Sequence, residues 1–475
     1  MANKNLLLMT DTYKIGHMRF YKPGTTKVYS YLCARSDKKE KQTLFFGLQY
    51  YLKEYLSKGV THKDVDEFLE YHNSILGPAP QDVVDKMRSL ADLGYLPIEI
   101  KAVPEGTIID NKNVLCTVTN TLPGFHWVVG YVESLILKVW NTCTVGTHSL
   151  KFKKLVTTFA KETSDSDFLL PFLVHDFGYR GCSSEETAAL SGAAHLVNFT
   201  GTDTVPAVKL MKEYYKGEGL IGASVPASEH SVACSYGKDG ELDYFRQMLK
   251  LNPTGIVSIV SDTYNLWTVL TDYATELKEE ILGRDGKVVF RPDSGDPFKI
   301  LCGDPDADKD SPEFFGAIQL LDKTFGSTVN SKGYKELNSK IGIIYGDGMY
   351  YERFASILQR MKEMGYASTN LVIGIGGLLL QQHNRDDLGF AFKATFAEID
   401  GKKVELFKDP ITDSGKRSHK GLMSLRKDLN GKYYTLDQVD ENEEKNTELV
   451  QVFLDGSIKK EYTLEEIRKS VNNSL

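Results

Sequence analysis

The stretch His175-Asp176-Phe177-Gly178-Tyr179-Arg180-Gly181 combines an acid, an aromatic ring and a cation directly after an apolar run, Phe168 to Val174. A capped-helix pattern beginning at Ser183 follows it. A strand that ends in such residues and turns into a capped helix places functional groups at its carboxyl end. Phe177 and Arg180 are therefore predicted to form one wall of a pocket for a flat ring.

Other apolar runs also end in glycine and charged residues. Gly376-Gly377 offers backbone N–H groups with no Cβ in the way, which suits a phosphate, although a tight turn needs the same residues. Gly346-Asp347-Gly348 adds a carboxylate suited to ribose hydroxyls. Arg291 and Asp293 flank a proline, and taken alone they indicate a surface salt bridge.

The histidines allow several roles. His230 lies beside Glu229 at the start of a predicted helix, where it can be a general base, a phosphate carrier or a capped polar residue. Its local sequence favours the structural role. His175 and His195 lie among apolar residues, so both are predicted to be hydrogen-bonded core residues.

Cations gather late in this acidic chain, at Arg385, Lys393, Lys408, Lys416 and Arg417. They suit a small polyanionic substrate, and the alternative is a solvated basic face.

The elements that must position these residues change in character along the chain. Between 165 and 382, short apolar strands alternate with helical segments at 184–198, 204–215, 263–282 and 349–364. That alternation predicts a parallel α/β barrel with its chemistry at the strands' carboxyl ends. Residues 1–164 are predicted to form an α+β part. The strand-rich and charge-rich residues 383–475 are expected to pack with it as one discontinuous domain.

Composition limits the class of protein. A net charge of −7 gives no support for bulk nucleic-acid or membrane-surface binding. No apolar run reaches the ~20 residues that span a bilayer. The six cysteines are scattered without a CxxC pair, which favours thiols in a reducing compartment over disulfides or zinc. Asp304 to Asp310 lacks EF-hand spacing, so a solvated loop is expected in place of a calcium site. We expect a cytoplasmic protein.

Longer motifs extend over nearly the whole chain. They are Thr10 to Lys14, Val28 to Tyr31, Leu96 to Gly106, His175 to Gly181, Gly201 to Val205, Ser224 to Ala227, Glu229 to Ser231, Arg291 to Gly295, Gly346 to Gly348, Phe407 to Pro410 and Lys416 to Ser418. In these motifs and their order the sequence resembles the nicotinamide phosphoribosyltransferases, which are type II phosphoribosyltransferases of the nicotinate/nicotinamide family.

The resemblance implies an irregular parallel α/β barrel beside a discontinuous α+β domain formed by the N- and C-terminal parts. It implies a head-to-tail homodimer with active sites at the subunit interface. The implied reaction joins nicotinamide and phosphoribosyl pyrophosphate to give nicotinamide mononucleotide and pyrophosphate, in NAD salvage. Mg²⁺ and ATP are the implied cofactors. ATP would phosphorylate a histidine and so favour synthesis without being strictly required.

The resemblance also implies a role for each candidate residue. Phe177, Arg180, Asp203, Ser224 and the partner's Tyr13 would bind the pyridine ring and its amide. Arg291, Gly346, Asp347, Gly376, Gly377 and Arg385 would hold ribose and its 5′-phosphate. Arg35, Lys393, Lys408 and Lys416 would meet pyrophosphate. His230 would carry the phosphoryl group, with Asp262 orienting it, and Asp262 and Asp293 would surround Mg²⁺ through waters.

The sequence departs from the family pattern at Gly342, where an arginine is common, and at Ala391, where a serine is expected. Three other functions remain open: a nicotinate-using relative, a binding or signalling protein that retains the barrel, and an unrelated phosphosugar barrel such as an aldolase. Against the last, no strand-end lysine is placed to form a Schiff base.

Overall fold

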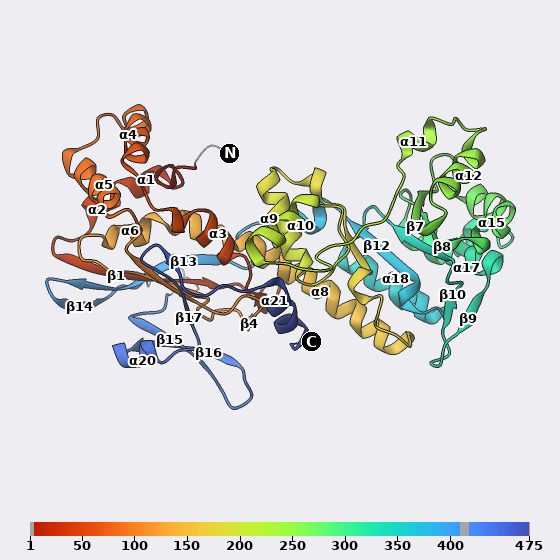
Figure 1. Cartoon of the computed structure of the whole chain (residues 1–475). Coiled ribbons are helices and arrows are strands. Elements are labelled where there is room, and N and C mark those ends of the chain that lie inside the picture. The colour runs from red at the N-terminus through yellow and green to blue at the C-terminus, as the bar shows by residue number, and fades with distance from the viewer. Residues whose placement is uncertain (1–3, 409–417, 475) are drawn as a thin grey trace. The chain divides into compact units, whose positions relative to one another are not determined.

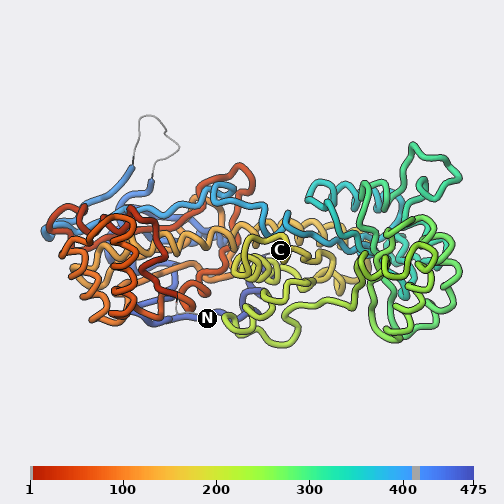
Figure 2. Tube along the Cα trace, turned by 90° about the horizontal axis from the view of Figure 1, so that it is seen from above, coloured from red at the N-terminus to blue at the C-terminus, as the bar shows by residue number. Residues whose placement is uncertain are grey.

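The computed structural model describes residues 4–408 and 418–474, and the chain divides into two compact units (Figure 1). Unit 1 consists of Met1–Thr147, Met211–Gly217 and His383–Leu475, and unit 2 consists of His148–Leu210 and Glu218–Gln382. The N- and C-terminal parts share a unit, with red and blue segments side by side in Figure 2, as predicted. Helix α8 (Val139–Thr163) contributes to both units.

Five parallel strands form the core of unit 2. Their order is β6 (Val174–Asp176), β12 (Leu371–Ile375), β11 (Ile341–Tyr345), β8 (Asp285–Arg291) and β7 (Thr254–Val260). Two short segments, at 201–202 and 223–227, lie between the edge strands β6 and β7. Isolated parallel bridges link them in turn: Asp176 of β6 to Thr202, Gly201 to Ala223, and Ala227 to Ser258 of β7. The ring closes through these bridges, so the predicted irregular α/β barrel is confirmed.

Helices follow the strands. They are α9 (Glu185–Leu196), α10 (Val205–Tyr215), α11 (His230–Cys234), α12 (Glu241–Leu251), α13 (Leu266–Thr268), α14 (Ala274–Glu276), α15 (Lys278–Gly283), α16 (Pro297–Cys302), α17 (Pro312–Phe325), α18 (Tyr351–Glu363) and α19 (Gly377–Leu380). The helix predicted at 263–282 begins later and is interrupted. The Asn265 side chain accepts the N–H groups of Trp267 and Thr268 and starts the helix at Leu266, and a π turn occupies Val269–Tyr273. A small hairpin, β9 (Ser327–Val329) with β10 (Lys335–Leu337), lies between α17 and β11.

An antiparallel sheet forms the core of unit 1. Its order is β14 (Lys402–Glu405), β13 (Phe390–Ile399), β1 (Thr25–Ala34), β5 (Cys116–Asn120), β3 (Ile98–Ala102), β17 (Val450–Leu454) and β18 (Ser457–Ile458). The register pairs Tyr31 with Lys393 and Ala34 with Phe390, which places Lys393 of β13 beside the strand that leads directly into Arg35. β13 and β14 form a hairpin, and Asp400 and Gly401 make its turn with φ values of 50° and 70°.

Shorter elements complete unit 1. They are the pairs β2 (Gln42–Leu44) with β4 (Ile108–Asp110) and β15 (Leu422–Lys427) with β16 (Tyr433–Val439), and the helices α1 (Thr12–Ile15), α2 (His17–Phe20), α3 (Leu48–Glu54), α4 (His62–Leu76), α5 (Gln81–Leu93), α6 (His126–Tyr131), α7 (Glu133–Ile136), α20 (Glu441–Lys445) and α21 (Leu464–Asn472). Within the described residues, no helix is both long enough and apolar enough to cross a membrane.

Candidate active site

The carboxyl ends of the barrel strands carry most of the predicted site residues. Phe177 follows β6, Asp293 follows β8, Gly346 follows β11 and Gly376 follows β12. Because the strands are parallel, these ends lie at one rim of the barrel, where α/β barrel enzymes place their chemistry.

The Phe177 ring lies against the backbone of β12. The backbone N–H of Phe177 donates a hydrogen bond to the carbonyl of Ile375 at 2.9 Å. A Cβ on Gly374 would lie 2.2 Å from Cε2 of Phe177, far inside normal carbon contact, so a glycine is required under the ring. The His175 ring packs beside it, with centroids 4.7 Å apart. The ring predicted from the sequence to form a pocket wall is therefore held in place by packing against the backbone of the neighbouring strand β12.

The carboxylate of Asp203 lines the same cavity as the Phe177 and His175 rings. Its Oδ1 lies 2.9 Å from Nε2 of His175 and accepts a hydrogen bond from the Ser224 hydroxyl. Burial disfavours the ionised form, but the bonds to His175 and Ser224 and the charge of Arg291 outweigh it and hold the pKa of Asp203 below its usual value. Since both bonds fall on one oxygen, the second oxygen is open to an N–H donor.

Asp176 fixes the two loops that carry these groups. It is fully buried, and its carboxylate accepts hydrogen bonds from the Gly178 N–H at 2.7 Å and the Thr202 hydroxyl at 2.8 Å. Its carbonyl accepts the Asp203 N–H at 2.9 Å. Asp176 therefore ties the ring wall to the carboxylate, and sequence reasoning gave it no role.

A cavity of about 500 Å³ extends from this rim into the barrel. At the rim it is lined by His175, Phe177, Asp203, Ser224 and Arg291. The Nε of Arg291 is buried without a hydrogen-bond partner, so this arginine belongs to the cavity and the surface salt bridge considered from the sequence is not formed. The volume is within the usual range for small-molecule sites.

His230 lies beside two carboxylates. Its Nε2 is 3.7 Å from Asp262 Oδ1 and 3.8 Å from Asp293 Oδ2, and its Nδ1 is 3.1 Å from the Thr263 hydroxyl. The imidazole is 45% exposed, so it is accessible to a ligand. Burial raises the pKa of Asp293, and Asp262 acts in the same direction.

Asp262 and Asp293 offer oxygen ligands to a divalent cation. Asp262 is almost fully buried, and its Oδ2 accepts the Asp293 N–H at 2.7 Å and the Ser294 hydroxyl at 2.6 Å. Its Oδ1 is buried with no hydrogen-bond partner. Such an orphaned oxygen fits a hard cation. Across the described residues, no three His, Cys, Asp or Glu side chains converge as a ligand set, so water would complete the coordination of Mg²⁺.

The loop after β12 leaves room for a ligand. A Cβ on Gly376 or on Gly377 would find its nearest atom 3.8 Å away, so crowding by the protein requires glycine at neither position. Gly181 packs tightly on this loop, where a Cβ would lie 3.1 Å from the Gly377 Cα. Arg180 and Asp347 are exposed at the same rim.

Unit 1 collects the predicted cations. Burial lowers the pKa of Lys393, and the charges of Arg35 and Lys408 act in the same direction, so both cations lie within electrostatic reach of Lys393. The Arg35 N–H donates to the carbonyl of Leu388 at 3.0 Å. Arg385 pairs with Asp386 at 2.9 Å. Lys416 lies outside the described residues.

Tyr13 is 63% exposed on α1 and packs edge-on against His17, with ring centroids 5.2 Å apart. Its neighbour Lys14 pairs with Glu133, whose charge also acts on Lys393. The exposed ring and the cation group therefore belong to one region of unit 1. Glu133 was not singled out from the sequence.

The two core-histidine predictions had different outcomes. His195 is buried between the Ser149 hydroxyl at 2.9 Å and the Val174 carbonyl at 3.2 Å, as predicted, and burial lowers its pKa to about 4. His175 is hydrogen-bonded, as predicted, but its partner is Asp203 and its side chain lines the cavity, so the predicted core position was wrong. A three-residue strand is too short for its apolar pattern to reveal which face a residue occupies.

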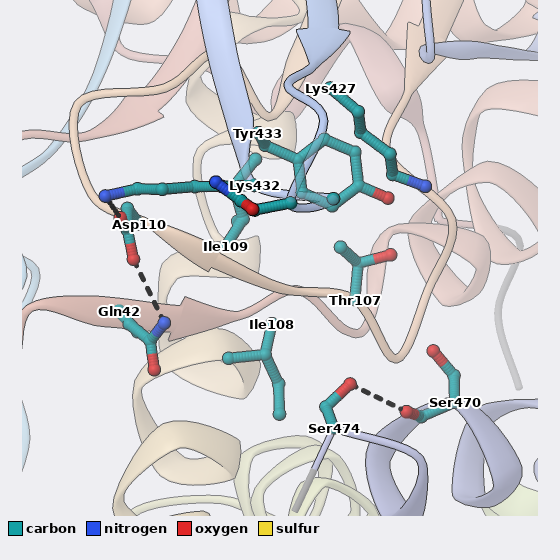
Figure 3. Close-up of a pocket in the computed structure, with 12 residues that line it drawn as sticks. Gln42, Thr107, Ile108, Ile109, Asp110, Lys427, Lys432, Tyr433, Ser470 and Ser474 are labelled. Atoms are coloured by element: carbon teal, nitrogen blue, oxygen red, sulfur yellow. Dashed lines mark hydrogen bonds and ion pairs between the residues drawn. The ribbon is translucent and has the colours of Figure 1, made fainter.

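Unit 1 has a separate hollow of about 520 Å³ between β4, the β15–β16 turn and α21 (Figure 3). Its cations are already paired: Lys432 with Asp110 at 2.9 Å and Lys427 with Glu448 at 3.3 Å. Gln42 donates to the same Asp110, and the Ser474 hydroxyl donates to the Ser470 carbonyl. Both lysines of this hollow are therefore already paired with carboxylates of the chain.

Comparison with known proteins identifies two matching family models. Residues 172–457 match the nicotinate phosphoribosyltransferase (NAPRTase) family, and residues 5–100 match the nicotinamide phosphoribosyltransferase N-terminal domain. A nicotinamide phosphoribosyltransferase of Acinetobacter baylyi is 40% identical, covering 99% of this chain and 98% of the relative. One of Xanthomonas campestris pv. campestris is 41% identical, covering 98% and 97%.

Two solved structures share the fold. The nicotinate-nucleotide pyrophosphorylase of Pyrococcus furiosus aligns with a TM-score of 0.62 at 15% identity, covering 100% of this chain and 97% of that one. Human nicotinic acid phosphoribosyltransferase aligns with a TM-score of 0.57 at 16% identity, covering 98% and 93%.

Proposed function

The chain belongs to the nicotinate phosphoribosyltransferase family, and from that membership we propose that it transfers the phosphoribosyl group of phosphoribosyl pyrophosphate to nicotinamide. The products are nicotinamide mononucleotide and pyrophosphate, and the activity serves NAD salvage. The observation that carries the choice of nicotinamide is the ionised Asp203 in the cavity beside Phe177.

The ring pocket selects an amide by charge and by hydrogen bonding. Phe177 stacks on the pyridine ring, and Arg180 approaches the ring or its amide. The open oxygen of Asp203 accepts an amide N–H, and Ser224 helps to hold that carboxylate. A nicotinate carboxylate in the same position would be repelled by Asp203, so the acid is disfavoured.

The sugar phosphate is held at the rim. Arg291, Gly346 and Asp347 contact the ribose. Gly376 and Gly377 hold the 5′-phosphate together with Arg385 of the partner subunit. Departure of pyrophosphate leaves positive charge at the ribose C1, so the leaving group must be neutralised. Arg35, Lys393, Lys408 and Lys416 supply that charge. The clamped ring presents its nitrogen to C1 from the opposite face.

Asp262 and Asp293 would hold Mg²⁺, directly or through water. The ion, when bound, adds positive charge at the pyrophosphate oxygens. The orphaned oxygen of Asp262 supports this assignment.

The ring and ribose groups belong to unit 2, whereas Tyr13 and the cations belong to unit 1. In our proposal these sets meet across a head-to-tail homodimer, with the partner's Tyr13 on the second face of the ring. Phe177→Ala and Lys393→Met should each be inactive alone. Unfolded, mixed and refolded together, they should recover about a quarter of wild-type activity, since half of the dimers carry one intact site. A site built within a single chain would recover none.

A parallel assay with nicotinamide, nicotinate and quinolinate tests the substrate. We expect turnover of nicotinamide, and loss of the preference for nicotinamide over nicotinate in Asp203→Ser. Asp239→Ser, an exposed aspartate of the same unit, is the control and should leave the preference unchanged. An unchanged preference in Asp203→Ser would remove that residue's role, and turnover of neither base would favour a binding protein.

A nicotinate-using enzyme is the second candidate. The unpartnered Nε of Arg291 in the cavity favours it, because a guanidinium can receive a carboxylate. Wild-type turnover of nicotinate above that of nicotinamide would establish this alternative.

His230 is our proposed phosphoryl acceptor from ATP, with Asp262 orienting the imidazole. Its exposure and the two nearby carboxylates support the role. ATP labelled at its γ-phosphate should give acid-labile protein label that is absent from His230→Ala. His62→Ala, which alters an exposed histidine beside Asp92, should keep it. Label that persists in His230→Ala would rule out the assignment.

A further inference from the structure

Arg35 and Arg385 lie on two segments of unit 1, 35–39 and 384–389, that are joined through their backbones. The Arg35 N–H donates to the carbonyl of Leu388 at 3.0 Å, and the next N–H of the chain donates to the same carbonyl at 2.9 Å. Two arginines that are distant in the sequence are therefore carried by neighbouring segments of one unit.

The carboxylate of Asp387 ties the same two segments together through side chains. It is only 5% exposed, and its Oδ1 accepts a hydrogen bond from the Lys39 ammonium group at 2.7 Å. Its Oδ2 accepts the Asn384 N–H at 3.3 Å and lies 3.6 Å from Nδ1 of His383. Burial acts against the ionised form, but the bonds from Lys39 and Asn384 outweigh it and hold the pKa of Asp387 below its usual value. Asp387 is therefore an ionised, buried link between the segments.

Lys39 is the exposed half of this ion pair. Its side chain is 62% exposed, so replacing it leaves the packing of the core unchanged. A separate residue holds the loop that carries it: the side-chain amide of Asn111 donates to the carbonyls of Ser36 and Glu40, each at 2.7 Å. The loop should therefore stay folded without Lys39. What the Lys39–Asp387 pair determines is how this loop lies against segment 384–389.

We propose that Lys39 and Asp387 are positioning residues that fix the separation of Arg35 and Arg385, and so match unit 1 to a sugar that carries phosphate groups at both ends. The inference rests on the proposed function, in which Arg385 holds the 5′-phosphate and Arg35 of the same subunit meets the pyrophosphate. A ligand held at both ends binds more tightly than either half, because its second contact forms within the complex. That advantage requires the two arginines to be correctly spaced.

Calorimetric titration of the full-length protein with phosphoribosyl pyrophosphate, ribose 5-phosphate and pyrophosphate, each with Mg²⁺, tests this positioning. Lys39→Met should raise the Kd for phosphoribosyl pyrophosphate about tenfold, which is part of the roughly 100-fold or greater advantage of a two-ended contact. The Kd of each single-ended ligand should change less than about twofold, because each needs only one of the arginines. Lys39→Arg keeps the ion pair and should behave as wild type. Lys38→Met, which removes the neighbouring exposed lysine, is the control for charge and should leave the relative affinities unchanged.

Asp387→Asn should show the same selective loss, because it removes the charge that holds Lys39. The Lys39 variants decide the question if this variant does not fold. A direct contact between Lys39 and phosphate would instead raise the Kd for pyrophosphate in Lys39→Met and lower it in Asp387→Asn, and that result would overturn the proposal.

Three other results would also overturn it: equal losses for all three ligands, an unchanged Kd for phosphoribosyl pyrophosphate in Lys39→Met, or a wild type that binds this ligand no more tightly than pyrophosphate. A selective loss in Lys39→Met together with no turnover of nicotinamide by wild type would contradict only the proposed function.

Discussion

Gly374→Ala tests directly whether the Phe177 ring packs against the backbone of β12. The new Cβ would lie 2.2 and 2.3 Å from two carbons of the Phe177 ring, whereas carbon atoms pack at about 3.5–4.0 Å. The ring must therefore move by more than about 1 Å, and the His175 ring is already packed beside it. Overpacking of this kind costs about 1–3 kcal/mol of stability. A reacting ring displaced by about 1 Å loses on the order of 100-fold in rate.

The assay is a double-mutant cycle, read by denaturant unfolding and by kcat/KM for nicotinamide. Phe177→Leu removes the ring carbons that clash, so Gly374→Ala should cost at least about 1 kcal/mol less in that background than in wild type. Gly283→Ala, whose Cβ would meet no atom within 4 Å, is the control and should be close to neutral. Additive stability effects, or a Gly374→Ala enzyme with normal kcat/KM, would refute the seating of Phe177 on β12.

Three further outcomes follow from the electrostatics. His175→Phe removes a hydrogen bond to the Asp203 carboxylate, so the pKa of Asp203 should rise, and the kcat/KM preference for nicotinamide over nicotinate should be lost at a higher pH than in wild type as pH is lowered. Lys393→Met removes a cation repelled by Arg35 and Lys408, so Tm should rise while the Kd for phosphoribosyl pyrophosphate, measured by calorimetry, increases. Because burial holds the pKa of His195 at about 4, the unfolded chain takes up a proton near pH 6.5 that the folded chain refuses. The free energy of unfolding should therefore decrease by up to about 3 kcal/mol as pH falls from 6.5 to 4, as urea unfolding of wild type and His195→Asn would show.

The strand-end motifs could be predicted from the sequence because their chemistry is local. An apolar run followed by Phe177, or by Gly346 and Asp347, indicates a strand whose carboxyl end carries function, and the structure places these residues at one rim. The glycine under the ring could not be predicted in that way. Gly374 and Phe177 are far apart in the sequence, and their contact depends on the pairing of β6 with β12.

His175 and Lys287 show a second limit of the sequence. Both lie next to apolar residues on short strands, where the pattern does not distinguish the barrel interior from the face covered by helices. The sequence predicts a core position for His175, whereas in the structure its side chain forms a hydrogen bond with Asp203. Only the closed ring of strands shows that Lys287 lines the cavity.

The charges of each unit are consistent with the substrate of the proposed function. In unit 2, burial raises the pKa of Asp293, the charges of Asp262 and Asp347 act in the same direction, and the buried Oδ1 of Asp262 has no hydrogen-bond partner. In unit 1, Lys393 is repelled by two neighbouring cations. Each set costs free energy in the unliganded protein, so neither is explained by folding. In the proposed homodimer a magnesium-bound polyanion would relieve both, because Asp262 and Asp293 would hold the metal and the partner subunit's cations would meet the anion's oxygens. Its binding should therefore stabilise both units, and the energy it releases is available to organise the site for the transferred sugar.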